Sequence, residues 1–88
     1  MAKDCKYLGD ADGVSDERWG TRAVSAYFRV GGEYQDQPST PDAYEYEGRH
    51  YVVLANSAGI LAMYRVKNDG TLRRLRRFPA CIVKAVEG

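Results

Sequence analysis

Apolar and polar residues alternate most regularly in the second half of the chain, between turns that carry glycine at fixed positions. The three-residue connections at 57–59 and 68–70 both end in glycine. This suits a type I turn followed by a left-handed residue, because glycine has no Cβ to clash. The runs on both sides of each connection have the period of two that is typical of β-strands. The pattern predicts a tightly turned antiparallel β-meander over residues 44–78.

A third turn completes the predicted meander and fixes its register. Gly48-Arg49 has glycine at the first central position, as a two-residue type II′ hairpin requires, and this turn pairs Tyr46 with Tyr51. The other turns set Leu54 opposite Ala62, Val52 opposite Tyr64, Val66 opposite Leu72 and Met63 opposite Leu75.

The register divides the meander into two faces, and both are rich in apolar residues. The first face collects Val52, Leu54, Ile60, Ala62, Tyr64, Val66, Leu72 and Phe78. The second face collects Tyr44, Tyr46, Tyr51, Val53, Leu61, Met63 and Leu75, together with Arg65, Arg73 and Arg77. Both are too apolar to remain in water. We expect the first face to pack on the core. The second face should be covered by the N-terminal strand, the C-terminal segment or a partner.

The first third of the chain is less regular. Residues 1–20 contain several turn formers and are expected to be irregular, with Ser15 capping a short helical turn. Residues 21–34 are predicted to form a strand, because apolar side chains alternate with others up to Val30. A helix over this stretch is the alternative.

The remaining segments complete a single small domain of 88 residues. Residues 35–43 carry two prolines among polar residues and are expected to be an exposed loop. Pro79 ends the meander, and residues 79–88 favour a short C-terminal helix over another strand. The predicted fold is mainly β, or α+β if that helix forms, with an antiparallel meander of four or five strands. A small SH3-like curled barrel and an open sheet both fit this pattern.

The formal net charge of +1 hides a segregation along the chain. Residues 1–47 carry five basic and ten acidic side chains, a net charge of −5, whereas residues 48–88 carry eight basic and two acidic, a net charge of +6. Such polarity either steers an anionic partner toward one face or lets the two halves attract each other within the fold.

The densest positive charge is the run Arg73-Arg74-Leu75-Arg76-Arg77 at the end of the meander. Guanidinium groups bind carboxylates and phosphates through paired hydrogen bonds, and neighbouring tyrosine rings offer stacking surfaces. On a strand the four arginines divide equally between two faces, which weakens the case for a groove that follows a nucleic-acid backbone. The alternative is an edge strand whose charge prevents aggregation, with some arginines paired to the acidic half.

We therefore expect a non-enzymatic binding domain that presents a basic, Tyr- and Arg-rich sheet surface to a protein partner with acidic character. A nucleic-acid-binding module that uses the same strand is one alternative. Self-association as a homo-oligomer through the second apolar face is another. The expected partner-binding residues are Tyr46, Arg49, Tyr51, Arg65, Arg73, Arg74, Arg76 and Arg77.

No catalytic residue, cofactor or metal site is predicted. His50 is the only histidine, and nothing near it in the sequence supplies the nucleophile or acid that a general base needs. Asp10, Asp12 and Asp16 loosely suggest a cation loop, yet no bidentate glutamate follows at the distance that a calcium loop requires. Turn formation explains these acids.

The two cysteines and the hydropathy of the chain suggest a cytoplasmic protein. Cys5 and Cys81 lack both the spacing of a zinc site and the density of a secreted disulfide framework. We expect two partly buried thiols, with a disulfide between the ends of the chain as the alternative. No stretch approaches the roughly 18 apolar residues of a membrane span, so no membrane partner is expected.

Overall fold

The computed structural model describes residues 5–31 and 37–87 and confirms an antiparallel meander. Neighbouring strands follow in chain order: β1 (Lys6–Asp10), β2 (Asp42–Tyr46), β3 (Arg49–Asn56), β4 (Gly59–Val66) and β5 (Leu72–Arg74). The helices are α1 (Ala11–Val14), α2 (Trp19–Gly31) and α3 (Ala80–Glu87). The sheet is open rather than closed into a barrel, with β1 and β5 at its edges. Because α3 forms, the α+β version of the predicted fold class is confirmed.

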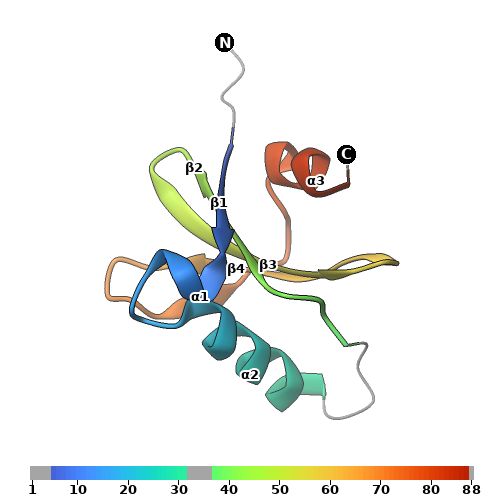
Figure 1. Ribbon diagram of the computed structural model, residues 1–88, viewed down its shortest axis with the longest axis horizontal. Helices are drawn as coiled ribbons and strands as arrows, with labels where there is room; N and C mark the ends of the chain where they lie inside the picture. The colour runs from blue at the N-terminus through green and yellow to red at the C-terminus, as the bar shows by residue number, and fades with distance from the viewer. Residues whose placement is uncertain (1–4, 32–36, 88) are drawn as a thin grey trace.

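The helices lie on opposite sides of the sheet, which gives the molecule three layers. In Figure 1, α1 and α2 lie below the sheet, and α3 lies above it near the start of β1. The hydrophobic core is correspondingly divided into two clusters, one on each face of the sheet.

The turns form where glycine was expected, but the first hairpin is closed one residue earlier. Glu47 and Gly48 occupy its two central positions with φ values of 53° and 77°, as in a type I′ turn. Tyr46 is therefore opposite Arg49, and the predicted pairing of Tyr46 with Tyr51 is wrong. Tyr51 instead faces Tyr44. Because the register of β2 against β3 shifts by two residues, the side chains of β2 stay on their predicted face.

The register of the other two hairpins is confirmed. Leu54 faces Ala62, Val52 faces Tyr64, and Val66 faces Leu72. Beyond Leu54 a bulge leaves Leu61 unpaired and sets Ile60 opposite Ala55. This extra residue exchanges the faces of two side chains, because side chains alternate along a strand. Leu61 packs with the first face and Ile60 with the second, opposite to the prediction.

The first face of the sheet packs against α2. Trp19, Ala23 and Tyr27 follow one another at intervals of four residues and are all buried. They meet Val52 and Leu54, which are fully buried at the centre of the sheet. The prediction that this face forms the core is confirmed.

The second face is covered by the C-terminal segment, one of the three covers considered for it. Ile82 of α3 is fully buried in a cluster with Tyr44, Tyr51, Val53 and Met63. Pro79 starts the helix, since its carbonyl oxygen accepts hydrogen bonds from the amides of Ile82 and Val83. Phe78 joins this cluster rather than the first face, because the chain leaves the strand after Arg74.

The N-terminal segment is more regular than predicted. Residues 1–20 were expected to be irregular, but β1 and α1 form within them and α2 begins at Trp19. The Ser15 hydroxyl accepts a hydrogen bond from the Glu17 amide, yet residues 16–17 form a turn, and Arg18 has a φ of 55°. The carboxylate of Asp12 performs the capping at the start of α2 instead. It accepts hydrogen bonds from the Thr21 amide and hydroxyl at 2.9 and 2.8 Å.

The strand predicted for residues 21–34 is wrong, because α2 occupies this stretch through Gly31. Its sequence contains both periodicities: alternate apolar residues up to Val30, and Trp19, Ala23 and Tyr27 at helical spacing. The helical set prevails because it buries three side chains against the first face, while Val30 remains 75% exposed. Residues 32–34 lie outside the described part of the chain.

The predicted loop at 35–43 is shorter than expected, because β2 begins at Asp42. Its residues 37–41 are irregular and mostly exposed, and residues 35–36 lie outside the described part. The Ser39 amide donates to the Ala55 carbonyl at 2.7 Å, and the Ala11 amide donates to the Pro41 carbonyl at 2.9 Å. These two hydrogen bonds attach the segment to β3 and α1.

Candidate functional site

The arginine-rich end of the meander lies at one edge of the sheet. Arg73 in β5 is directly opposite Arg65 in β4 on the second face, and Arg74 is opposite Tyr64 on the first face. The Leu75 amide still donates to the Met63 carbonyl at 2.9 Å, so the ladder extends one residue beyond β5. The sequence-based division of arginines between two faces therefore holds for Arg73 and Arg74.

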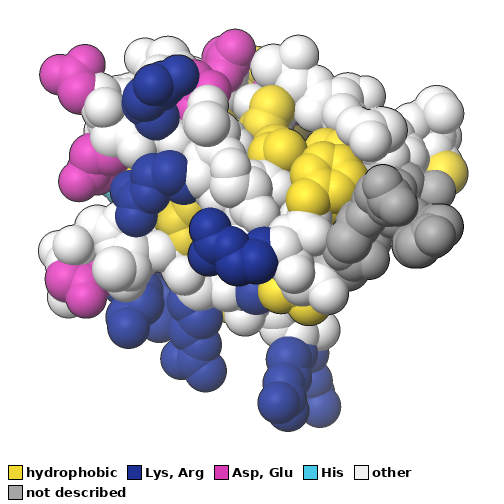
Figure 2. Space-filling view, turned by 90° about the horizontal axis from the view of Figure 1, so that it is seen from below, with side chains coloured by type: hydrophobic (Ala, Val, Ile, Leu, Met, Phe, Trp, Pro, Cys, Tyr) yellow, Lys and Arg dark blue, Asp and Glu magenta, His cyan; other side chains and the backbone are white. Residues whose placement is uncertain are grey.

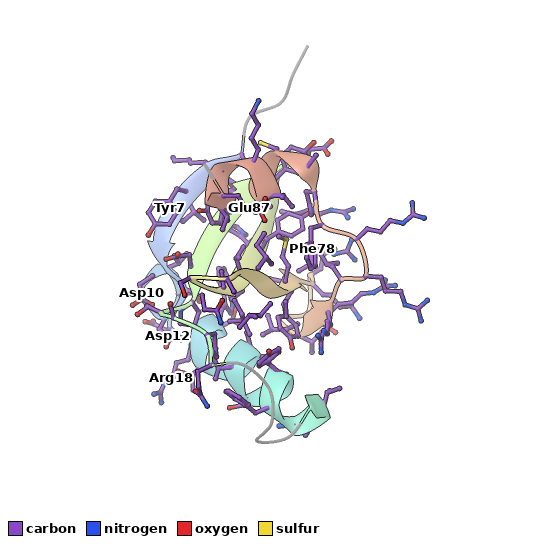
Figure 3. The ribbon with its side chains drawn as sticks, turned by 90° about the vertical axis from the view of Figure 1, so that its right-hand side faces the viewer. Tyr7, Asp10, Asp12, Arg18, Phe78 and Glu87 are labelled. Carbon is purple, nitrogen blue, oxygen red and sulfur yellow. The ribbon has the colours of Figure 1, made fainter. Side chains whose placement is uncertain are left out.

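Arg76 and Arg77 follow in an irregular segment between β5 and α3, and both are exposed. Figure 3 shows basic side chains projecting outward from this segment, while the labelled Phe78 lies on its inner side. Phe78 is half-buried and packs with the second-face cluster. The aromatic ring thus anchors the segment, and the guanidinium groups remain in solvent.

Two arginines that the sequence analysis did not single out belong to the same edge. Arg22 and Arg29 of α2 line a hollow together with Leu72 of β5. Arg22 also donates to the Gly70 carbonyl at 3.0 Å, which ties α2 to the hairpin between β4 and β5. We use the name basic rim for the set Arg22, Arg29, Arg65, Arg73, Arg74, Arg76 and Arg77.

The spacing of Arg22 and Arg29 in the sequence indicates that they lie together if this stretch is a helix. The strand prediction for the same stretch concealed this relation. Residues seven apart are two helical turns apart and lie on the same face of a helix. Arg22 and Arg29 have this spacing, so a helix prediction would have placed them together.

No ion pair joins the basic rim to a carboxylate within residues 5–31 and 37–87. The one such contact between described side chains joins His50 Nε2 and Glu45 Oε2 at 3.9 Å, and it is an ion pair only when the imidazole is protonated. In the view of Figure 2, Lys and Arg side chains gather at the centre left and lower edge, and Asp and Glu side chains stay at the left and upper edges. One interpretation of the charge segregation was that the acidic half of the chain pairs with the basic half within the fold. Among the described residues, no ion pair between a rim arginine and a carboxylate provides such pairing.

A second hollow extends the positive charge across the second face. Arg49 and Arg65 line it together with Lys67 and Asp69. The Thr71 hydroxyl donates to the Asp69 carboxylate at 2.6 Å and holds the pKa of that carboxyl below its usual value. Asp69 thus stays ionised and is engaged by its own turn.

The two tyrosines expected to contact a partner lie mainly under α3. Tyr51 is 7% exposed within the second-face cluster, so its ring is part of the core. Tyr46 is half-buried and packs against the same cluster. Of the eight residues expected to bind a partner, the structure brings Arg65, Arg73, Arg74, Arg76 and Arg77 together along one hollow, and Arg49 lies beside it.

On the first face the rim lies over a pair of buried tyrosines. The guanidinium carbon of Arg74 lies 5.7 Å from the centre of the Tyr27 ring, within the range of a cation–π contact. The Tyr64 hydroxyl is buried without a hydrogen-bond partner among the described residues, and burial raises its pKa. Arg74 opposes that shift in pKa because its positive charge favours the phenolate.

The groups considered for metal binding or catalysis have structural roles. Asp10 accepts from the Asp12 amide at 2.9 Å, and Asp12 caps α2. No group of three potential metal ligands occurs in the described residues. His50 stacks on the Trp19 ring at 5.3 Å between centres. That the domain is not an enzyme stays a prediction.

The two cysteines, 76 positions apart in the chain, meet in the fold. The Cys5 amide donates to the Cys81 Sγ atom at 2.8 Å, which connects the start of β1 to the first turn of α3. Both residues are half-buried, and no disulfide joins them. The expectation of two partly buried thiols agrees with this arrangement.

A comparison with protein-family models, with curated proteins and with solved structures finds no match. No helix in the described part of the chain is long and apolar enough to cross a membrane.

Proposed function

We propose that the chain is a non-enzymatic binding domain whose basic rim contacts an acidic segment of a partner protein. The observation that carries this proposal is the direct opposition of Arg65 and Arg73 on neighbouring strands. Like charges that face each other across a sheet are destabilising. A carboxylate bound between these two side chains would replace their repulsion with charge-assisted hydrogen bonds.

A protein partner is favoured over nucleic acid by the distribution of the rim. Arg73 and Arg65 project from the second face and Arg74 from the first, so the arginines that border the edge hollow do not form one track along a single face of the sheet. A phosphate backbone needs such a track, whereas carboxylates of a peptide can project to both sides. A cytoplasmic location is part of the same proposal, because the cysteine pattern is not that of a secreted disulfide framework.

The geometry gives less support to self-association through the second face. The sequence offered the second face for self-association because its apolar residues needed a cover. In the structure α3 covers the central residues of this face, Tyr44, Tyr51 and Met63. A second copy of the chain would have to displace Ile82 before it could bind there.

Two variants with equal loss of charge test the proposal. Arg73→Ser/Arg77→Ser changes the rim, and Lys6→Ser/Lys84→Ser removes two exposed positive charges from β1 and α3. The probe is a fluorescent oligoglutamate peptide, with affinity measured by anisotropy at low salt. The rim variant should bind at least about tenfold more weakly than the wild type, a loss of about 1.4 kcal/mol or more. The control variant should change affinity by less than about threefold.

Equal effects of the two variants would mean that net charge alone attracts the peptide, and would refute a rim-specific site. A parallel titration with single-stranded and duplex oligonucleotides tests the alternative partner. Tight duplex binding that weakens by about 0.9 log units per log of salt for each neutralised phosphate would favour nucleic acid. Under our proposal the oligoglutamate peptide binds more tightly than an oligonucleotide of equal charge.

A further inference from the structure

The backbone of β5 has unpaired hydrogen-bonding groups on its outer side. Lys67 and Leu75 donate to the carbonyls of Thr71 and Met63, at 2.8 and 2.9 Å. Directly opposite residues in an antiparallel ladder alternate between bonded and non-bonded pairs. Arg73 therefore directs its amide and carbonyl toward β4.

The two residues that flank Arg73 direct the same groups outward. Leu72 and Arg74 are the non-bonded positions of the ladder, and β5 is the last strand of the sheet. Their amides and carbonyls offer four hydrogen-bonding groups to an additional strand.

The side chains of this edge present positive charge on both faces. Arg73 lies on the second face beside Arg65, and Arg74 lies on the first face, on the side of Arg22 and Arg29. Successive side chains of an extended peptide also point to opposite faces. A strand added to β5 would thus place neighbouring carboxylates near different arginines, one above the sheet and one below it.

There is room for such side chains on both faces. On the first face the hollow between α2 and β5 is lined by Arg22, Arg29 and Leu72. Beside the second face, Arg65 and Arg73 line a hollow that continues around the edge to Arg74, Arg76 and Arg77. Each hollow is bordered by guanidinium groups that have no carboxylate partner in the described residues.

We propose that β5 accepts an extended acidic segment of the partner protein as a sixth strand of the sheet. This inference rests on the proposed function and specifies how the rim recognises its partner. Backbone hydrogen bonds to Leu72 and Arg74 supply the pairing, and the arginines on the two faces select carboxylates. The same charges repel basic strands and disfavour uncharged ones, so protection of the edge and choice of partner have one physical origin.

Peptide probes separate this mode from simple charge attraction. The first probe is an extended glutamate-rich peptide with consecutive glutamates at its centre. The second has the same sequence with its central backbone amides N-methylated, which keeps every carboxylate and removes the donors for pairing. Strand addition predicts that the methylated peptide binds at least about tenfold more weakly.

A protein variant tests the same hydrogen bonds from the other side. Arg74→Pro removes the outward amide of residue 74, and the ladder to β4 does not use that amide. Arg74→Ser removes the same guanidinium group and keeps the amide. The proline variant should bind the unmethylated peptide at least about fivefold more weakly than the serine variant.

Amide exchange locates the added strand. The peptide should slow exchange at Leu72 and Arg74 and leave Arg73, which already bonds to β4, almost unchanged. This measurement and the methylated peptide do not depend on the folding of any variant.

Equal affinity for the two peptides, with loss of both in Arg73→Ser/Arg77→Ser, would overturn strand addition and leave the acidic-partner proposal intact. Failure of both peptides to bind the wild-type protein at low salt would overturn both proposals.

Discussion

The two faces of the sheet are covered in different ways, although the same strands supply both. On the first face, α2 has 13 residues and buries Trp19, Ala23 and Tyr27 over successive turns. On the second, α3 has 8 residues and buries only Ile82. The first cover is therefore an integral part of the core, whereas the second has one fully buried side chain with the half-buried Val86 beside it, and we expect it to open more easily.

The largest effect should follow from removing a buried ring on the first face. Trp19→Ala deletes the side chain that begins the buried row of α2, and should lower the free energy of unfolding by about 3–5 kcal/mol. Urea denaturation followed by circular dichroism measures the change. A loss below about 1 kcal/mol would show that α2 is no more essential than α3.

Oxidation should strengthen the weaker cover. The Cys5 amide touches Cys81 Sγ, so thiol–disulfide exchange with oxidised glutathione should join the two sulfurs, releasing two molecules of glutathione. A link between the start of β1 and α3 should raise the free energy of unfolding by about 2–4 kcal/mol.

The disulfide should also abolish the separate opening of α3, which amide exchange in this helix measures. Cys81→Ser is the control that cannot form the link. An oxidised protein whose α3 amides exchange as fast as before would contradict the assignment of α3 as the loosely held cover.

A smaller loss should follow from truncating the one buried contact of α3. Ile82→Ala should lower the global free energy of unfolding by about 2 kcal/mol, the low end for such a change, because α3 can open without the rest of the fold. Amide exchange should become faster in α3 than in β3. Equal acceleration in both elements would mean that the helix and sheet unfold as one unit.

Removing the buried Tyr64 hydroxyl on the first face should raise the free energy of unfolding, whereas truncating Trp19 or Ile82 lowers it. Tyr64→Phe removes an oxygen that has no hydrogen-bond partner in the described part of the chain, and should stabilise the protein by up to about 1 kcal/mol. Thermal melting measures this, with Tyr44→Phe on the second face as the comparison. Destabilisation by Tyr64→Phe would indicate that the hydroxyl has a bonded partner in solution.

Acid should weaken the first face through Asp12. The Thr21 amide that donates to Asp12 lowers the pKa of this carboxyl. A lowered pKa in the folded state gives stability that is present above the unfolded value, about 3.9. This stability disappears as pH falls through the lower folded value.

The melting temperature measured as a function of pH tests this smallest effect. Asp12→Asn should have a flatter profile than the wild type below about pH 4. Identical slopes would show that Asp12 does not contribute to acid sensitivity. The first turn of α3 has no acidic residue that could cap the helix in the same way.

The sequence predicted what depends on local chemistry and missed what depends on distant contacts. The turns ending at Gly59 and Gly70 follow from glycine at turn positions, and the registers of their hairpins were predicted correctly except at the bulge that exchanges Ile60 and Leu61. β1 pairs with β2 across more than thirty intervening residues, a separation that no turn pattern encodes. Its Gly9, with a φ of 97°, also interrupts the alternation that marks a strand.

The candidate site shows the same limit. Arg73, Arg74, Arg76 and Arg77 are adjacent in the chain and were recognised as one cluster. The contributions of Arg22 and Arg29 depended on α2, whose apolar residues also fit a strand. Burial against the sheet decides between the two periods, and that information is tertiary.

The opposition of Arg65 and Arg73 has a consequence for ligand screening. Any multivalent anion that settles between these side chains, such as citrate, sulfate or heparin, relieves their repulsion and stabilises the native state by mass action. Such compounds should raise the melting temperature, whatever the natural partner is. A screen that ranks compounds by thermal shift will therefore select for charge density. Selecting instead for binding that persists in concentrated salt would reveal ligands that fit the edge by shape.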